Sequence, residues 1–178
     1  MATNIAKPCV LVVGGGYVGI YAALRLQKKL SPGEATITVV DPQPNMTYQP
    51  FLPEAAAGAI EARHVVVPLR RVLRRSEVLA ATVESVDHGR RVATLHPSEG
   101  EAFELPYDVL VMAPGSVSRA LPIPGLAEVG IGFKTIGEAV HLRNHILSRL
   151  DVASTEAPVV RRQRLDDLPY KARGEAEP

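Results

Sequence analysis

The chain has 178 residues, of which 46% are hydrophobic and 22% are charged, and its 20 Lys and Arg nearly balance 19 Asp and Glu. The length suits about one domain, and the composition excludes a wholly disordered chain. A net charge of +1 argues against nucleic-acid binding, which needs a basic surface. The single cysteine, Cys9, excludes an internal disulfide and a paired-cysteine redox or metal site, and we expect it to be a small buried hydrophobe.

The stretch from Pro8 to Leu24 carries no charge over 17 residues. That length is the short limit of about 17–25 residues for a membrane-spanning helix. Three consecutive glycines interrupt the stretch, and a signal peptide would begin with more basic residues. We therefore predict no transmembrane segment and a cytoplasmic protein.

The first predicted elements form a βαβ unit. Cys9–Val13 and Thr36–Val40 are short β-branched runs typical of buried strands, and Tyr17–Leu30 has the helical spacing of apolar residues. Neither strand alternates apolar with polar residues, which is typical of a parallel sheet covered on both faces. Asp41 ends this unit, which is about 33 residues long.

The middle of the chain predicts first a loop and two short helices, then antiparallel strands. The loop is expected over residues 42–53, and the helical stretches over 54–60 and 68–75. The strands 77–87 and 91–95 flank a tight turn, and 102–105 adds a third, which together predict a β-meander. The fold class is therefore α/β, a Rossmann-like parallel sheet with a β-meander insertion.

The remaining elements follow in a simple order. The sequence predicts an apolar strand over 108–112, a loop over 125–132, a short strand over 133–136 and an amphipathic helix over 137–150. Beyond Asp151 the chain is polar and lacks periodicity, so we predict a poorly ordered tail over 151–178.

A glycine-rich loop is the strongest functional motif. Gly14, Gly16 and Gly19 form G-x-G-x-x-G between the first strand and the first helix, and Asp41 follows 22 residues after Gly19. This context predicts a dinucleotide site, in which the acidic residue binds a ribose. The alternative is a tight strand-to-helix turn with no ligand.

Each position in this loop has an expected physical role. Gly14 allows the sharp turn, Gly16 allows the pyrophosphate to approach the backbone, and Gly19 allows close helix–strand packing. Backbone N–H groups at the helix start, together with the helix dipole, favour the phosphates, so the predicted site also includes Gly15, Tyr17 and Val18. Asp41 would repel a 2′-phosphate, which argues against NADP; its alternative role is to start a turn before Pro42.

The β-meander favours FAD over NAD, because a simple NAD domain continues with parallel strands. Four segments then resemble the N-terminal FAD domain of the pyridine-nucleotide-disulfide oxidoreductase superfamily and, within it, the type II NADH dehydrogenases. In chain order they are VVGGGYVGIYAALRLQ, TVVDPQPNMTYQPFLPEAAAG, YDVLVMAPGSVSRALPIPG and GFKTIGEAVHLRNHIL. The resemblance implies that residues 1–150 are an FAD-binding domain.

The resemblance also assigns roles to single residues. Gly14, Gly16 and Gly19 match the FAD pyrophosphate loop, and Asp41 matches the acid on the adenosine ribose. The further matching positions are Gln49 and Pro50 near the flavin, Val83 contacting adenine through its backbone, and Ala113, Pro114 and Gly115 in a second FAD motif. Pro114 replaces the usual threonine, which removes a hydroxyl and a backbone donor.

Two departures from the family pattern limit the expected activity. The chain lacks the redox cysteine pair of the disulfide reductases, so thiol–disulfide chemistry is excluded. The family also has a second glycine loop for NADH, which should begin soon after Leu150, yet the polar Arg161–Pro178 stands there. We expect the FAD-binding portion of an NADH:acceptor (quinone) oxidoreductase, apparently truncated and inactive alone, with NADH as co-substrate only in a complete enzyme.

The sequence also allows functions other than a flavin-binding portion. The alternative functions are a non-catalytic dinucleotide-binding module, an inactive truncation product and an NAD-binding dehydrogenase fragment. Self-association through the surface of the missing domain is also expected.

Two side-chain clusters are interpreted as solvated faces: His141 and His145, one helical turn apart, and the arginine cluster over 70–75. No metal site is therefore predicted. No acid–base catalyst is predicted either, because a flavin itself accepts the hydride.

Overall fold

A computed structural model describes residues 7–119 and 121–155. The chain divides into two compact units. We call the first, which comprises residues 7–47 and 66–116, the sheet unit. The second, which comprises residues 48–65 and the described residues from 117 onward, is the helical unit.

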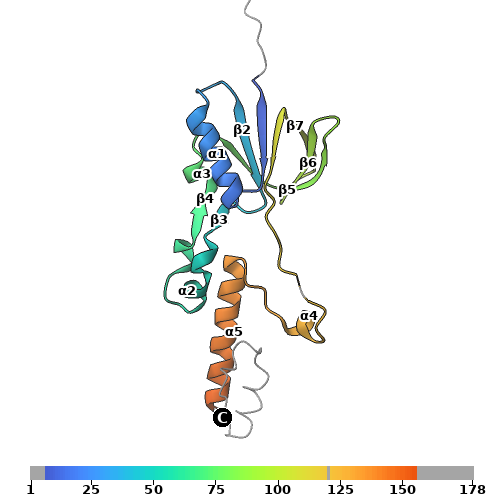
Figure 1. Ribbon diagram of the computed structural model, residues 1–178. Helices are drawn as coiled ribbons and strands as arrows, with labels where there is room; N and C mark the ends of the chain where they lie inside the picture. The colour runs from blue at the N-terminus through green and yellow to red at the C-terminus, as the bar shows by residue number, and fades with distance from the viewer. Residues whose placement is uncertain (1–6, 120, 156–178) are drawn as a thin grey trace, which may run out of the picture. The chain divides into compact units, whose positions relative to one another are not determined.

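The sheet unit is built on one six-stranded sheet with the order β7-β6-β5-β2-β1-β8 (Figure 1). Its strands are β1 (Cys9–Val13), β2 (Thr36–Asp41), β5 (Glu77–Asp87), β6 (Val92–Pro97), β7 (Phe103–Pro106) and β8 (Val109–Met112). The pairs β1–β2, β1–β8 and β2–β5 are parallel, whereas β5–β6 and β6–β7 are antiparallel. This arrangement confirms the predicted α/β fold with a parallel sheet and a β-meander.

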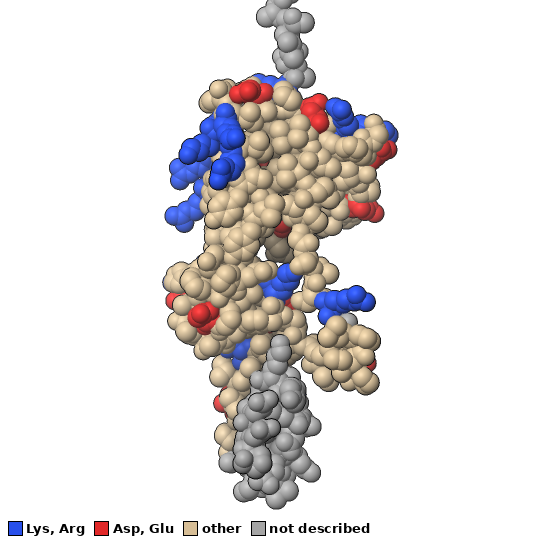
Figure 2. All heavy atoms as spheres, in the orientation of Figure 1, with Lys and Arg blue, Asp and Glu red and all other residues tan. Residues whose placement is uncertain are grey.

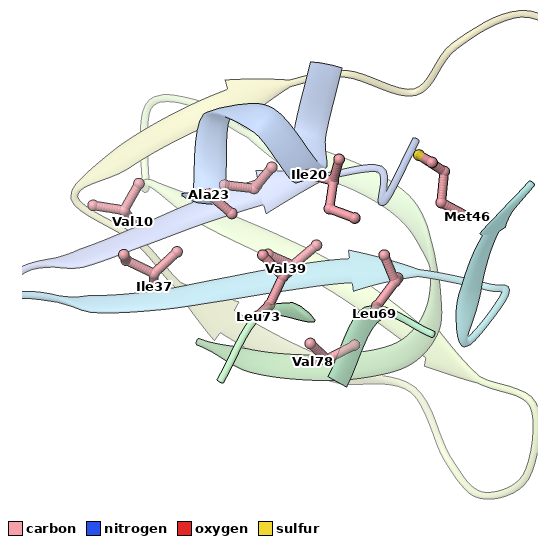
Figure 3. Close-up of a cluster of buried hydrophobic side chains, with 10 residues drawn as sticks. Val10, Ile20, Ala23, Ile37, Val39, Met46, Leu69, Leu73 and Val78 are labelled. Atoms are coloured by element: carbon pink, nitrogen blue, oxygen red, sulfur yellow. The ribbon is translucent and has the colours of Figure 1, made fainter. Parts of the chain in front are cut away.

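The first helix, α1 (Tyr17–Lys29), packs on one face of this sheet and explains why β1 and β2 are almost wholly apolar. Alternate strand residues such as Val10 and Val39 are buried against Ile20 and Ala23 of α1 (Figure 3). The intervening residues, among them Leu11, are buried on the other face. Both faces are covered, so neither strand alternates in polarity.

A small second sheet corrects the predicted loop over residues 42–53. β3 (Asn45–Thr47) pairs antiparallel with β4 (Val66–Pro68), and Met46 of β3 is buried in the core around α1. Three-residue strands are too short for a period-2 pattern to be recognised, which explains the error. The helix after β4, α3 (Leu69–Val72), has Pro68 at its N-cap and is shorter than the predicted helix.

The helical unit consists of short helices and one long one. Its elements are η1 (Gln49–Phe51), α2 (Leu52–Ala56), η2 (Ala62–His64), α4 (Leu126–Val129) and α5 (Ile136–Thr155). Leu52, Ala55, Val65 and Ala139 form its buried core. None of the described helices is long and apolar enough to cross a membrane.

The structure corrects two predicted elements of this unit, and other predictions for its end stay untested. Residues 125–132 were predicted as a loop but contain α4, and 133–136 form no strand because Ile136 already begins α5. α5 also continues to Thr155, past the predicted end of the domain at residue 150. The polar segment Arg161–Pro178 lies outside the described residues, and the division at residue 150 stays a prediction.

Candidate nucleotide-binding site

The glycine loop joins β1 to α1, and its first glycine is required by the backbone. Gly14 has a φ of +100°, and a Cβ atom there would lie 2.1 Å from the carbonyl oxygen of Ala113. Its N–H donates to the carbonyl oxygen of Val40 at 2.8 Å. Gly14 therefore makes the turn at the point where β1, β2 and the end of β8 meet.

Two further glycines are explained by contacts inside the protein. A Cβ at Gly19 would lie 1.8 Å from the carbonyl oxygen of Gly14, so only glycine lets α1 lie this close to the loop. A Cβ at Gly15 would lie 2.5 Å from Cδ1 of Leu69, the first residue of α3. The sequence does not reveal that Leu69 packs against Gly15, because the two residues lie far apart in the chain.

Gly16 differs from these three, because nothing in the protein requires it to be glycine. It is the N-cap of α1 with φ −74° and ψ −163°, a conformation that any residue adopts. Apart from its two chain neighbours, no atom of the described residues lies within 4 Å of the position that its Cβ would take, and the residue is exposed. Its bare backbone therefore borders open space at the start of a helix.

The electrostatics of this helix start favour an anion. No side chain caps the N-terminus of α1, and no acidic residue lies in its first turn. The first N–H groups of α1 therefore receive no capping side chain, and the carboxylate beside them, that of Asp41, binds the Gly15 N–H before the helix starts. This geometry fits a phosphate group that approaches the backbone at Gly16.

Asp41 is coupled directly to the loop. One carboxylate oxygen accepts a hydrogen bond from the Gly15 N–H at 2.7 Å, and the other accepts one from the Gln43 N–H at 2.7 Å. The bond to Gln43 is the turn-starting role considered as the alternative, and the bond to Gly15 holds the loop. Each carboxylate oxygen has further lone-pair capacity, so Asp41 can still accept from a ribose hydroxyl.

The second predicted motif lies beside the first. The Ala113 N–H donates to the Val13 carbonyl oxygen at 2.8 Å, which places the end of β8 next to the end of β1. Gly115 has a φ of +74°, and Pro114 offers no N–H. Ala113, Pro114 and Gly115 thus follow the parallel sheet at the same edge as the glycine loop.

The other predicted residues are placed less directly. Val83 lies on β5 opposite Leu95, and its side chain packs against a core cluster, which leaves only its backbone for a ligand. Gln49 and Pro50 are exposed in η1 of the helical unit. Their predicted place near the flavin stays a prediction.

A small pocket near Asp41 was not foreseen from the sequence. It has a volume of about 160 Å³ and lies between β5, β6 and the residue after Asp41. We call it the β5–β6 pocket; it is lined by Pro42, Ala80, Ala81, Thr82, His96, Pro97 and Ser98. No sequence motif marks it, because its walls come from two strands paired by the fold.

Cys9 is only half-buried, less than expected, and burial raises the pKa of its thiol. Among the described residues, no group of three or more His, Cys, Asp or Glu is placed to hold a metal ion. His141 and His145, interpreted from the sequence as a solvated face, have ring centroids 6.3 Å apart on α5.

The arginine cluster has a structural role besides its solvated face. Figure 2 shows Lys and Arg side chains gathered over α1 and α3. Within this group, the Arg75 guanidinium donates to the carbonyl oxygens of Gln27 and Leu30, which lie at the end of α1. Arg75 therefore satisfies backbone acceptors that the helix itself leaves open.

Comparison with known proteins identifies the family. A family model described as pyridine nucleotide-disulphide oxidoreductase matches residues 8–160. The chain belongs to this family. The resemblance predicted from the four sequence segments is thereby confirmed, including its likeness to type II NADH:quinone oxidoreductases.

Individual relatives have names that agree with this family. The chain is 28% identical over 170 residues to the mitochondrial external alternative NADH-ubiquinone oxidoreductase of Yarrowia lipolytica, covering 90% of this chain and 28% of that protein. It is 30% identical over 158 residues to the type II NADH:quinone oxidoreductase Ndh of Mycobacterium tuberculosis, covering 88% and 33%.

A solved structure supports the fold. NDH2 from Plasmodium falciparum, in complex with RYL-552, matches with a TM-score of 0.81 at 20% identity, over 89% of this chain and 33% of that chain. The chain therefore spans about a third of the length of these relatives and of the matched structure.

Proposed function

We propose that the sheet unit binds FAD, as the flavin-binding portion of an NADH:acceptor oxidoreductase that uses a quinone. The observation that carries the proposal is Gly16, whose lack of a side chain is explained by no contact within the protein. A phosphate that needs close access to the backbone explains it. The uncapped start of α1 and the adjacent carboxylate of Asp41 supply the matching charge and acceptor.

The residues divide the work as follows. Backbone N–H groups from Gly16 to Gly19 hold the pyrophosphate, while Gly14 and Gly15 shape the loop through their bonds to Val40 and Asp41. Asp41 accepts the hydroxyls of the adenosine ribose. Val83 contacts the adenine through its backbone, and Ala113, Pro114 and Gly115 border the cofactor at the end of β8. Gln49 and Pro50 approach the flavin side. Bound FAD would supply the hydride-accepting chemistry, while the protein supplies binding and orientation.

One observation favours FAD over NAD in this site, and the names of the relatives support the proposed reactants. The β-meander of β5, β6 and β7 follows the parallel strand pair, as expected for the FAD domains that the sequence resembles. The relatives are named as NADH:quinone and NADH-ubiquinone oxidoreductases. Because the chain spans about a third of those proteins, the reaction with NADH and a quinone is proposed for the whole protein.

The test is a titration of the purified chain with FAD, followed by its absorbance and fluorescence, beside the variant Gly16→Ser. Wild type should acquire bound-flavin bands. The serine side chain would fill the space needed by the phosphate, and loss of one or two charged hydrogen bonds of about 1.5–3 kcal/mol each should weaken FAD at least roughly tenfold. A wild-type chain that binds NAD but takes up no flavin would support the dehydrogenase-fragment alternative instead. Equal FAD affinity in both proteins would contradict the assigned role of Gly16.

A further inference from the structure

The β5–β6 pocket lies where a nucleotide bound at the glycine loop would place its base. Asp41 pairs with Ala80 in the parallel ladder, and Thr82 lies two residues further along β5, about 7 Å at roughly 3.3 Å per residue. Strand side chains alternate between faces, so Ala80 and Thr82 stand on the same face as Asp41. The pocket thus continues from the proposed ribose site along one face of the sheet.

The size and lining of the pocket suit one flat ring. Its volume of about 160 Å³ is below the roughly 300–1,000 Å³ of pockets for drug-sized ligands, so it holds part of a dinucleotide rather than all of it. Pro42 and Ala80 supply apolar side chains to its walls. Apolar walls pack on ring faces, while polar groups at the edge fix which ring is accepted.

His96 is the lining residue with a defined and unused hydrogen-bonding atom. It lies opposite Thr82 in the β5–β6 ladder and is exposed. Its Nδ1 lies 3.0 Å from the carbonyl oxygen of Pro97, which can only accept, so Nδ1 carries the proton. In the neutral ring Nε2 is then an acceptor, and it makes no hydrogen bond with the described part of the chain.

We infer that His96 is a specificity-determining residue, whose Nε2 accepts a hydrogen bond from the exocyclic amino group of an adenine seated in the β5–β6 pocket. This inference rests on the proposed dinucleotide site and adds a base-reading side chain to it. An amino group is a donor and matches the acceptor, whereas a ring that presents a carbonyl oxygen at the same place leaves two acceptors facing each other. The site therefore selects adenine over hypoxanthine.

The experiment compares two cofactors in the full 178-residue chain. The dissociation constants of FAD and of flavin hypoxanthine dinucleotide, which carries a carbonyl in place of the amino group, are measured by fluorescence for wild type, His96→Ala, His96→Gln and Ser98→Ala. One hydrogen bond of about 0.5–1.5 kcal/mol corresponds to a preference for FAD of roughly two- to tenfold in wild type. His96→Ala should lose this preference by weakening FAD alone, and the amide oxygen of His96→Gln should restore part of it.

Ser98→Ala is the matched control, because it changes another side chain of the same pocket and should keep the preference. Flavin binding without any preference in wild type overturns the inference while leaving the proposed function in place, and this comparison needs no variant to fold. Equal weakening of both cofactors by His96→Ala overturns it as well, because a merely structural histidine would act on both. A wild-type chain that binds neither cofactor overturns the proposed function and this inference together.

Discussion

Gly16 and Gly19 are three residues apart in one motif, yet they are glycine for different physical reasons. Gly19 is required by packing, because a Cβ there would lie 1.8 Å from a backbone oxygen. A Cβ at Gly16 would meet no neighbouring atom of the described residues within 4 Å, and any residue can adopt its backbone conformation. The sequence pattern predicted both positions but could not separate packing from ligand access, since that distinction depends on neighbouring atoms.

This distinction predicts effects on stability of very different size. Gly19→Ala should lower the free energy of unfolding by roughly 1–3 kcal/mol, because the added methyl forces α1 away from the loop. Gly16→Ser should change it by only a few tenths of a kcal/mol, because serine is a good N-cap residue. Urea unfolding of the two variants without cofactor measures both. A Gly16→Ser variant as unstable as Gly19→Ala would show that the space at Gly16 is needed for folding.

At the scale of elements, long regular runs were predictable and short ones were not. β1 was predicted with its observed bounds, and α1 and β2 within one residue, because a continuous apolar run or a helical period identifies them. β3 and β4 have three residues each, and their pairing depends on contacts with the rest of the sheet unit. The β5–β6 pocket was missed for the same reason, because strand register brings Thr82 opposite His96.

The start of α5 carries a signal that the sequence reading overlooked. Thr135 and Glu138 have the spacing of a capping box, in which each side chain accepts a hydrogen bond from the other residue's backbone N–H. The Glu138 N–H donates to the Thr135 hydroxyl at 3.2 Å, and the Thr135 N–H donates to the Glu138 carboxylate at 2.7 Å. The same carboxylate accepts from the Lys134 N–H at 2.8 Å. Recognition of this box would have placed the helix start correctly.

The capping box makes the stability of the helical unit depend on pH. Hydrogen bonds from the Lys134 and Thr135 N–H groups lower the pKa of Glu138 below its ordinary value of 4.5. A lowered pKa in the folded state gives stability that is fully present above the unfolded value and is lost as the pH falls through the folded value. Glu138→Gln keeps an acceptor but removes the charge, so it should cost roughly 0.3–1 kcal/mol at pH 7, and the difference from wild type should shrink below pH 4.5.

Thr135→Ala is the control for this measurement. It removes the hydroxyl cap at every pH, so its cost of about 1 kcal/mol should change little with pH. Unfolding is followed by circular dichroism over the acid range and at neutral pH. A difference between wild type and Glu138→Gln that stays constant across this range would contradict a role for the carboxylate charge.

At the scale of the whole molecule, the predicted site residues are shared between two units. The glycine loop, Asp41, Val83 and Ala113–Gly115 belong to the sheet unit, whereas Gln49 and Pro50 belong to the helical unit. The geometry of the first group supports a nucleotide site by itself. The role of the second group rests on the family resemblance, so the two can be tested separately.

Hydrogen exchange measured with ADP and with FAD tests the two groups of site residues separately. ADP carries the pyrophosphate, ribose and adenine but lacks the flavin, so at saturation it should slow exchange in the glycine loop and around Asp41 and leave residues 48–52 unchanged. FAD should protect the same segments and, if Gln49 and Pro50 contact the flavin as proposed, residues 48–52 as well. At 100-fold excess over the dissociation constant, either ligand should raise global stability by about 2.7 kcal/mol, which confirms occupancy. Protection by FAD that stays confined to the sheet unit would show that Gln49 and Pro50 do not contact the flavin in this chain.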